Sequence, residues 1–156
     1  MITRILVALD ASPRAPGVLA AAGEIASRFG AKLTLFRALH IPPDFPPAAH
    51  VEHGDPLPQH LTKEAFESLE ALAATLPDGL RASALVRVGQ SWRTILEVAD
   101  EVEADLIVVG SHGYYGIDRV LGTTAGKVAN LARRNVLVVH EPNPARSSQA
   151  PPRPGD

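Results

Sequence analysis

The sequence contains no cysteine, which excludes a disulfide-stapled scaffold, thiol catalysis and thiolate metal ligands. No apolar run approaches the roughly 20 residues of a membrane-spanning helix, and the first ten residues lack the pattern of a secretory signal. Neither sign of charge is in large excess, because the formal net charge is −2, so no basic field attracts nucleic acid or anionic lipid. We therefore expect a soluble cytoplasmic protein that binds neither nucleic acid nor membrane.

The composition fits one globular domain that carries two proline-rich segments. Of the 156 residues, 46% are hydrophobic and 21% charged, which is enough to bury a substantial core. Eleven of the fourteen prolines fall within residues 41–60 and 141–156. The first segment is too rich in proline for a helix or a central strand, which predicts a surface loop. The second has few apolar side chains to bury and is predicted to be a disordered tail.

Outside these segments, short apolar runs alternate with runs of helical spacing. The apolar runs predict strands at Ile2–Leu9, Lys32–Leu39, Ala82–Val88, Asp105–Val109 and Asn135–His140. Four helical stripes separate them: Leu19, Ala22, Ala26 and Phe29; Ala65, Leu69, Leu72 and Leu76; Ile95, Val98, Ala99 and Val102; and Leu121, Thr124, Val128 and Leu131. Ser12-Pro13 and Ser91 are the expected starts of the first and third helices, although Pro16 favours a later start for the first.

This order of elements predicts an α/β fold with a mainly parallel sheet and helices on both faces. Ligands bind such sheets outside the carboxyl ends of the strands. The segment Val109–Val128 follows the fourth strand and holds five of the twelve glycines. Glycines let successive N–H groups converge on an anion, and a helix start at Thr123 and Thr124 adds partial positive charge and hydroxyl donors. The pattern favours a polyphosphate site, and the alternative is a solvent-facing loop that merely turns tightly.

The glycine spacing does not match the common nucleotide motifs. Gly122 and Gly126 are separated by three residues where a P-loop has four, and Val128 replaces its final Ser or Thr. The earlier glycines read G-x-x-G-x-x-G after the fourth strand, which is not a dinucleotide fingerprint. A second candidate feature is Asp10 at the end of the first strand. Its carboxylate could accept hydrogen bonds from a ribose or help to hold a divalent cation, and the alternative is an ordinary turn and helix cap.

Taken together, these segments resemble the universal stress protein family over residues 1–140. The matching stretches are ILVALDAS at the start, G-S-H-G after the fourth strand, LGTTAGKVANLA, and VLVVH at the last strand. The resemblance implies an adenine nucleotide alpha hydrolase-like, Rossmann-like sheet of five parallel strands in the order 3-2-1-4-5, and a homodimer formed through Val136–Val139. It also implies ATP binding, with Mg²⁺, through a G-x-x-G, a nine-residue spacer and a G-[ST], in a stress-response regulatory module.

Carried over residue by residue, the resemblance assigns nine positions to the nucleotide. Asp10 would hold the adenosine half, and the backbone of Ala38 would contact adenine. The phosphates and ribose would meet Gly110, His112 and Gly113, and the phosphates would meet Gly122, Thr123, Thr124 and Ala125. The sequence departs from the family pattern in two places: the spacer 114–121 has eight residues instead of nine, and His112 stands where the family often has arginine.

No catalytic residues and no metal ligands of the protein are predicted. Asp10 is the single carboxylate expected near the nucleotide, so any ATP hydrolysis would be slow. The histidines of the proline-rich loop are expected to be solvated, Trp92 to be a packing residue, and the alternatives for Lys127 are phosphate contact and simple solvation. The shortened spacer favours a second hypothesis, a dimeric interaction module without a nucleotide. The partner protein and the stress are not predicted.

Overall fold

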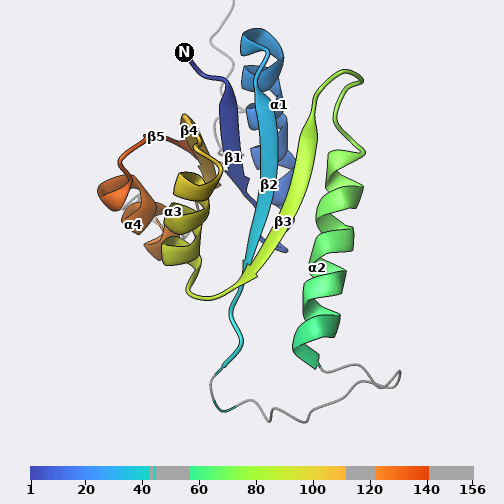
Figure 1. Cartoon of the computed structure of the whole chain (residues 1–156), viewed down its shortest axis with the longest axis vertical. Helices are drawn as coiled ribbons and strands as arrows, with labels where there is room; N and C mark the ends of the chain where they lie inside the picture. The colour runs from blue at the N-terminus through green and yellow to red at the C-terminus, as the bar shows by residue number, and fades with distance from the viewer. Residues whose placement is uncertain (43, 45–56, 112–121, 141–156) are drawn as a thin grey trace, which may run out of the picture.

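Strands and helices alternate along the chain, and the strands form one parallel sheet (Figure 1). The structure is a computed structural model that describes residues 1–42, 44, 57–111 and 122–140. The elements are β1 (Arg4–Ala8), α1 (Ala15–Phe29), β2 (Lys32–Leu39), α2 (Leu57–Ala73), β3 (Ala82–Val88), α3 (Ser91–Glu101), β4 (Leu106–Gly110), α4 (Thr123–Leu131) and β5 (Asn135–Val139). The sheet order is β3-β2-β1-β4-β5, and every neighbouring pair is parallel. The predicted fold class and strand order are confirmed.

Helices cover both faces of the sheet because its central strands are apolar on both sides. On one face, α1 and α2 bury residues such as Leu19 and Leu69 against Val7 and Leu35. On the other face, α3 and α4 bury their apolar stripes against residues such as Phe36. The continuous apolar sequences of β1 and β4 are therefore explained by a core on either side of each strand.

The capping signals place the starts of two helices slightly wrongly. Helix α1 begins two residues later than Ser12-Pro13 indicates, and α3 begins one residue earlier than a cap at Ser91 indicates. Helix α1 starts at Ala15 with Arg14 as its N-cap, so Ser12-Pro13 precedes the helix, and Pro16 lies in the first turn as expected. Ser12 remains in the turn, where its Oγ accepts a hydrogen bond from the Arg14 N–H at 3.3 Å. Ser91 is the first residue of α3 instead of its cap, which is Gln90.

The predicted loop 41–60 is too long at its C-terminal end. Helix α2 begins at Leu57, and Pro58 is tolerated because the N–H groups of a helical first turn have no intrahelical partner. Residues 43 and 45–56 of the predicted loop and the predicted tail 141–156 lie outside the described residues.

Some members of the predicted apolar stripes are not buried helix residues. Phe29, the last residue of α1, is 58% exposed, and Leu131, the last residue of α4, is 53% exposed. Leu76 lies past the end of α2 and Val102 past the end of α3, although both still pack against the core. Leu121 of the fourth stripe lies outside the described residues.

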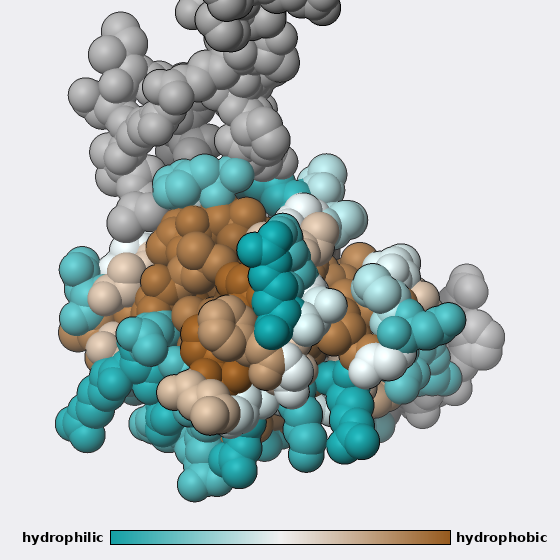
Figure 2. All heavy atoms as spheres, turned by 90° about the horizontal axis from the view of Figure 1, so that it is seen from above, coloured by the Kyte–Doolittle hydropathy of each residue, from teal (hydrophilic) through white to brown (hydrophobic). Residues whose placement is uncertain are grey.

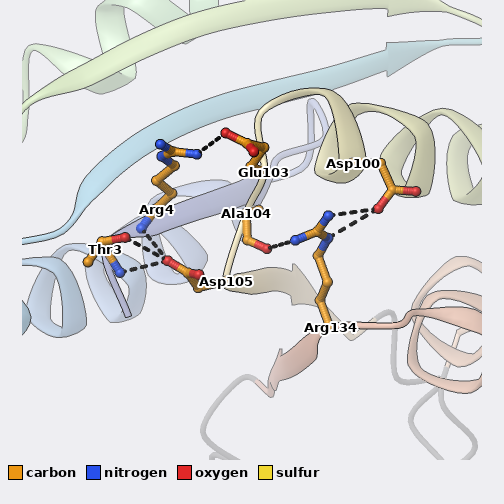
Figure 3. A network of polar contacts seen from close by, with 7 residues as sticks. All are labelled: Thr3, Arg4, Asp100, Glu103, Ala104, Asp105 and Arg134. Atoms are coloured by element: carbon orange, nitrogen blue, oxygen red, sulfur yellow. Dashed lines mark hydrogen bonds and ion pairs between the residues drawn. The ribbon is translucent and has the colours of Figure 1, made fainter. Parts of the chain in front are cut away.

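A polar network ties together the starting ends of β1 and β4 (Figure 3). One oxygen of Asp105 accepts hydrogen bonds from the Thr3 N–H at 2.8 Å, the Thr3 hydroxyl at 2.9 Å and the Arg4 N–H at 3.0 Å. Arg134, just before β5, donates to Asp100 of α3 at 2.9 Å and to the Ala104 carbonyl at 2.6 Å. These contacts fix the edge of the sheet opposite the carboxyl ends of its strands.

The surface carries hydrophobic as well as charged side chains. Figure 2 looks at the molecule from above and shows hydrophobic residues over much of the middle of this face, divided by a hydrophilic side chain and bordered by other hydrophilic residues. A large apolar area on a surface is a feature of proteins that associate with others.

No helix among residues 1–42, 57–111 and 122–140 is long and apolar enough to cross a membrane.

Candidate functional site

A cavity of about 120 Å³ opens at the carboxyl ends of the central strands. Parallel α/β sheets bind ligands at this edge. The described residues that line it come from β1, β2, β4 and the starts of α1, α3 and α4: Ala8, Leu9, Asp10, Arg14, Ala15, Val18, Phe36, Ala38, Ser91, Ile95, Val109, Gly110, Ser111 and Thr124. Residues far apart in the sequence therefore meet at one place.

One part of the cavity wall is apolar. Phe36 and Ala38 of β2, Ile95 of α3 and Val109 of β4 line it, and all four belong to the core between the sheet and α3 and α4. Because a sheet alternates its side chains between faces, Phe36 and Ala38 lie on the same face. The arrangement gives a wall that can accept a flat, largely apolar ring.

The turn that follows β1 carries the single carboxylate among the described lining residues. Asp10 Oδ1 accepts hydrogen bonds from the Ser12 N–H at 3.0 Å and the Ser12 hydroxyl at 2.6 Å. The turn role that the sequence left open for Asp10 is therefore present, and the side chain also borders the cavity. Both features place a carboxylate, an acceptor for ligand hydroxyl groups, at its mouth.

Arg37, which the sequence did not single out, lies behind this turn. It is only 8% exposed, and its guanidinium donates to the carbonyl of Leu9 at 3.2 Å through Nε and to the carbonyl of Asp10 at 2.9 Å through Nη2. Burial lowers the pKa of the Arg37 guanidinium below its ordinary value, and the nearby charge of Asp10 acts in the opposite direction. A charged residue with apolar neighbours on both sides, in the sequence LFRAL, was the available signal.

Three helices begin at the edge of the sheet that carries the cavity, and their starts are favourable for anions. The first turns of α1, α3 and α4 contain no acidic residue that would offset the partial positive charge of the helix N-termini from within the helix. Cationic side chains are present as well. Arg14 lines the cavity, and Arg93 and Lys127 lie over the ring of Trp92 at 5.4 Å and 5.2 Å from its centroid. The described part of this edge therefore offers three helix N-termini and nearby cationic side chains, together with the carboxylate of Asp10.

The structure brings four of the nine predicted site residues to the cavity wall: Asp10, Ala38, Gly110 and Thr124. Gly122 is the N-cap of α4 and Thr123 its first residue, while the side chain of Ala125 is buried in the core. His112 and Gly113, together with the eight-residue spacer, lie outside the described residues.

Trp92 packs against the core between α3 and α4, as predicted. Its indole N–H is buried and has no hydrogen-bond partner. Lys127 lies over its ring in a cation–π contact, so among the alternatives for this lysine the structure adds a third. Trp92 is the only tryptophan of the chain and lies in the first turn of α3, next to Ser91, which lines the cavity.

Metal ligands do not gather among the described residues, in which no three His, Asp or Glu side chains form a group that could hold an ion. Of the loop histidines, His40 follows β2 and is exposed, and His60 lies in α2, where it is paired with Glu64 at 3.1 Å. His50 and His53 lie outside the described residues.

The fold and the cavity define an α/β protein of the class that binds ligands at the carboxyl edge of a doubly covered parallel sheet. The family model of the universal stress protein family matches residues 1–140. The chain therefore belongs to the universal stress protein family.

Curated relatives agree with this membership over nearly their whole length. Universal stress protein A homolog 1 of Coxiella burnetii is 32% identical over 136 residues, which are 86% of this chain and 94% of the relative. Homolog 2 of the same organism is 34% identical over 137 residues, which are 87% of this chain and 93% of the relative.

Solved structures show the same architecture. Hypothetical protein MJ0577, from Methanocaldococcus jannaschii, has a TM-score of 0.73 at 25% identity and covers 92% of this chain and 99% of its own. A universal stress protein solved in complex with cAMP has a TM-score of 0.65 at 27% identity, covering 89% and 97%. The Archaeoglobus fulgidus universal stress protein in complex with dAMP has a TM-score of 0.60 at 25% identity, covering 88% and 98%.

Proposed function

We propose that this protein binds ATP, with Mg²⁺, in the cavity at the carboxyl edge of the sheet and acts in the cytoplasm as a regulatory module of the stress response. The observation that carries the proposal is the pairing of an apolar wall with three helix N-termini whose first turns contain no acid. An apolar wall suits a purine ring, and the helix N-termini suit phosphate groups.

Two structural neighbours support an adenine nucleotide over other ligands. One was solved in complex with cAMP and the other in complex with dAMP, so both hold an adenine and a phosphate. The part that they share is a base, a sugar and an anion, and the cavity offers a surface for each. ATP differs from these ligands in its longer phosphate chain, for which the cations beside α1, α3 and α4 provide compensation.

In this proposal each group of residues has one task. The adenine packs on Phe36 and Ile95 and meets the backbone of Ala38, and Asp10 accepts hydrogen bonds from the ribose hydroxyls. Gly122 and the first turn of α4 donate backbone N–H groups and hydroxyls to phosphate. Mg²⁺, when bound, neutralises phosphate charge, and it takes its remaining ligands from water because the described lining offers one carboxylate.

A titration of Mg-ATP tests the site through Asp10. We expect Asp10→Asn to weaken ATP by about tenfold, the effect of replacing a charged hydrogen-bond acceptor by a neutral one. Trp92 fluorescence follows binding, since the tryptophan packs between α3 and α4. The matched control is Asp78→Asn, an exposed residue in the turn before β3, and its affinity should equal that of the wild type. Equal affinities of all three proteins would contradict the assigned role of Asp10.

A dimeric interaction module without a nucleotide is the second candidate, and the cavity volume favours it. The volume is about 120 Å³, whereas pockets that enclose a drug-sized ligand measure about 300–1,000 Å³. Under the ATP proposal, the enclosed part therefore accommodates only the base, and the sugar and phosphates extend along the helix N-termini. Failure of Mg-ATP, ADP and AMP alike to bind would favour the second candidate. A slow ATPase is the remaining alternative, and steady-state phosphate release that Asp10→Ala abolishes would support it.

A further inference from the structure

Arg37 occupies an unusual position for a charged side chain. It belongs to β2, whose apolar residues on the same sheet face, Leu33 and Leu35, are buried under α1 and α2. The residues on either side of it, Phe36 and Ala38, face the opposite way and line the cavity. The Arg37 side chain is therefore not part of the cavity wall. It reaches the turn after β1 from the sheet face that α1 and α2 cover.

The guanidinium binds the main chain at the point where regular pairing between β1 and β2 ends. The last backbone bond of this pair runs from the Leu9 N–H to the Phe36 carbonyl at 2.8 Å. The Leu9 and Asp10 carbonyls then accept hydrogen bonds from Arg37 at 3.2 Å and 2.9 Å. The fork of the guanidinium thus spans two consecutive carbonyls, which the single ammonium of a lysine would not match.

Ser12 and Arg37 restrain Asp10 from two sides. Ser12 holds one carboxylate oxygen through its N–H and hydroxyl, and Arg37 holds the carbonyl of the same residue. With both its main chain and its side chain restrained, Asp10 has little freedom to turn away from the cavity. Restraint of this kind lowers the entropic cost of binding a ligand.

We propose that Arg37 is a positioning residue that acts through Asp10, making the site selective for a nucleotide with free ribose hydroxyls. The inference rests on the proposed function for its ligand, and the clamp on the turn stands on the hydrogen bonds alone. A role confined to stability would weaken every nucleotide equally. If Arg37 instead positions Asp10, its loss weakens only the binding of nucleotides whose ribose hydroxyls donate hydrogen bonds to Asp10.

The test compares ATP with 2′,3′-dideoxy-ATP, both as Mg²⁺ complexes, by calorimetric titration. The wild type should prefer ATP by about tenfold, since the dideoxy compound lacks both hydroxyls that donate to a charged acceptor. Arg37→Met should remove this preference while leaving the affinity for dideoxy-ATP within about twofold, because Arg37 does not touch the ligand. Arg37→Lys keeps the charge and one donor, so it should retain only part of the preference.

The matched control is Arg87→Met. Arg87 lies beside Ala38 in the neighbouring strand β3 and pairs with Glu101 on the surface at 3.2 Å. This variant should keep the full preference for ATP. A full preference in Arg37→Met would overturn the proposal. If the methionine variant does not fold, Arg37→Lys decides: a partial loss of the preference supports the proposal, and a full preference overturns it.

Hydrogen exchange of the nucleotide-free protein supplies a second readout. The Ser12 amide donates to Asp10 and should be protected in the wild type. Arg37→Lys should raise its exchange rate by about tenfold, the effect of losing one hydrogen bond to a charged group, whereas Arg87→Met should not. An unchanged rate would overturn the clamp. Absence of ATP binding to the wild type, with the clamp intact, would instead count against the proposed function.

Discussion

Gly110 shows how closely a single residue is fitted to the cavity. It is the last residue of β4 and lines the cavity, and a Cβ at this position would lie 3.0 Å from Cγ2 of Val18 in α1. That distance is shorter than an ordinary van der Waals contact, so the Val18 methyl group would have to shift by a few tenths of an ångström to accept an added Cβ. The glycine therefore allows the Val18 side chain of α1 to pack closely on the end of β4.

We expect Gly110→Ala to lower the free energy of unfolding by about 1 kcal/mol through overpacking. Val18→Ala removes the methyl group that the new Cβ would meet. In the double variant, the cost of Gly110→Ala should fall to a few tenths of a kcal/mol, within the additivity error of about 0.5 kcal/mol. Urea unfolding of the four proteins measures this coupling. Additive effects of the two substitutions would show that Val18 is not the obstacle.

At the scale of elements, the starts of β1 and β4 are joined by Asp105. Its carboxylate accepts two hydrogen bonds from Thr3 and one from Arg4, and these bonds lower the pKa of Asp105 below its ordinary value, with the Thr3 N–H as the main cause (Figure 3). A carboxyl whose pKa is lower in the folded than in the unfolded state stabilises the fold above its unfolded pKa. This contribution is lost as the pH falls through the folded pKa.

Asp105→Asn should therefore lower the urea midpoint at neutral pH, and the difference from the wild type should shrink toward acid. Measurement of both proteins between about pH 7 and pH 2 tests the sign and the pH window. The control is Asp78→Asn, because Asp78 is an exposed turn residue that lies outside the strands. A difference between Asp105→Asn and the wild type that stays constant with pH would show that the carboxylate charge is not responsible.

The helices show where sequence signals stop being sufficient. The apolar runs predicted the strands to within about two residues, because a strand buried on both faces has few alternatives. Helix starts were shifted because Ser12, Pro13 and Ser91 each satisfy a local preference that several neighbouring positions could satisfy equally well. Phe29 and Leu131 have the spacing of the buried stripes but are exposed, and each is the last residue of its helix, a position that the spacing alone does not reveal.

The site was predictable in part for similar physical reasons. Asp10 and Gly110 follow strands directly, so the rule for parallel sheets brings them to the cavity. Arg37 was missed because its partners are main-chain carbonyls, and no sequence pattern reports hydrogen bonds to carbonyls. Arg14 was missed because its position depends on the exact start of α1.

At the scale of the whole molecule, β5 is an edge strand of the described sheet. Its residues Val136–Val139 are partly buried in the isolated chain, and an apolar edge without a charged residue invites pairing with another strand. We propose that two copies pair through this edge about a two-fold axis, which would cover it in both chains.

Light scattering during gel filtration tests the dimer. The wild type should have twice the 16.5 kDa of one chain. Val138→Asp should be monomeric, because pairing through β5 would bring two like charges together in an apolar interface. Leu131→Asp, at the exposed end of α4, serves as the control and should remain dimeric. A wild type with the mass of a single chain would contradict pairing through β5.

Nucleotide binding is the central claim, and a thermal melt with and without Mg-ATP, together with a mass spectrum of small molecules released from the purified protein, tests it most directly. ATP at about 100 times its Kd adds roughly 2.7 kcal/mol of stability. For a chain of this size, that should raise Tm by about 5–10 °C. We predict such a shift, with or without a co-purified adenine nucleotide. No shift and no released nucleotide would contradict the claim and would favour the dimeric interaction module.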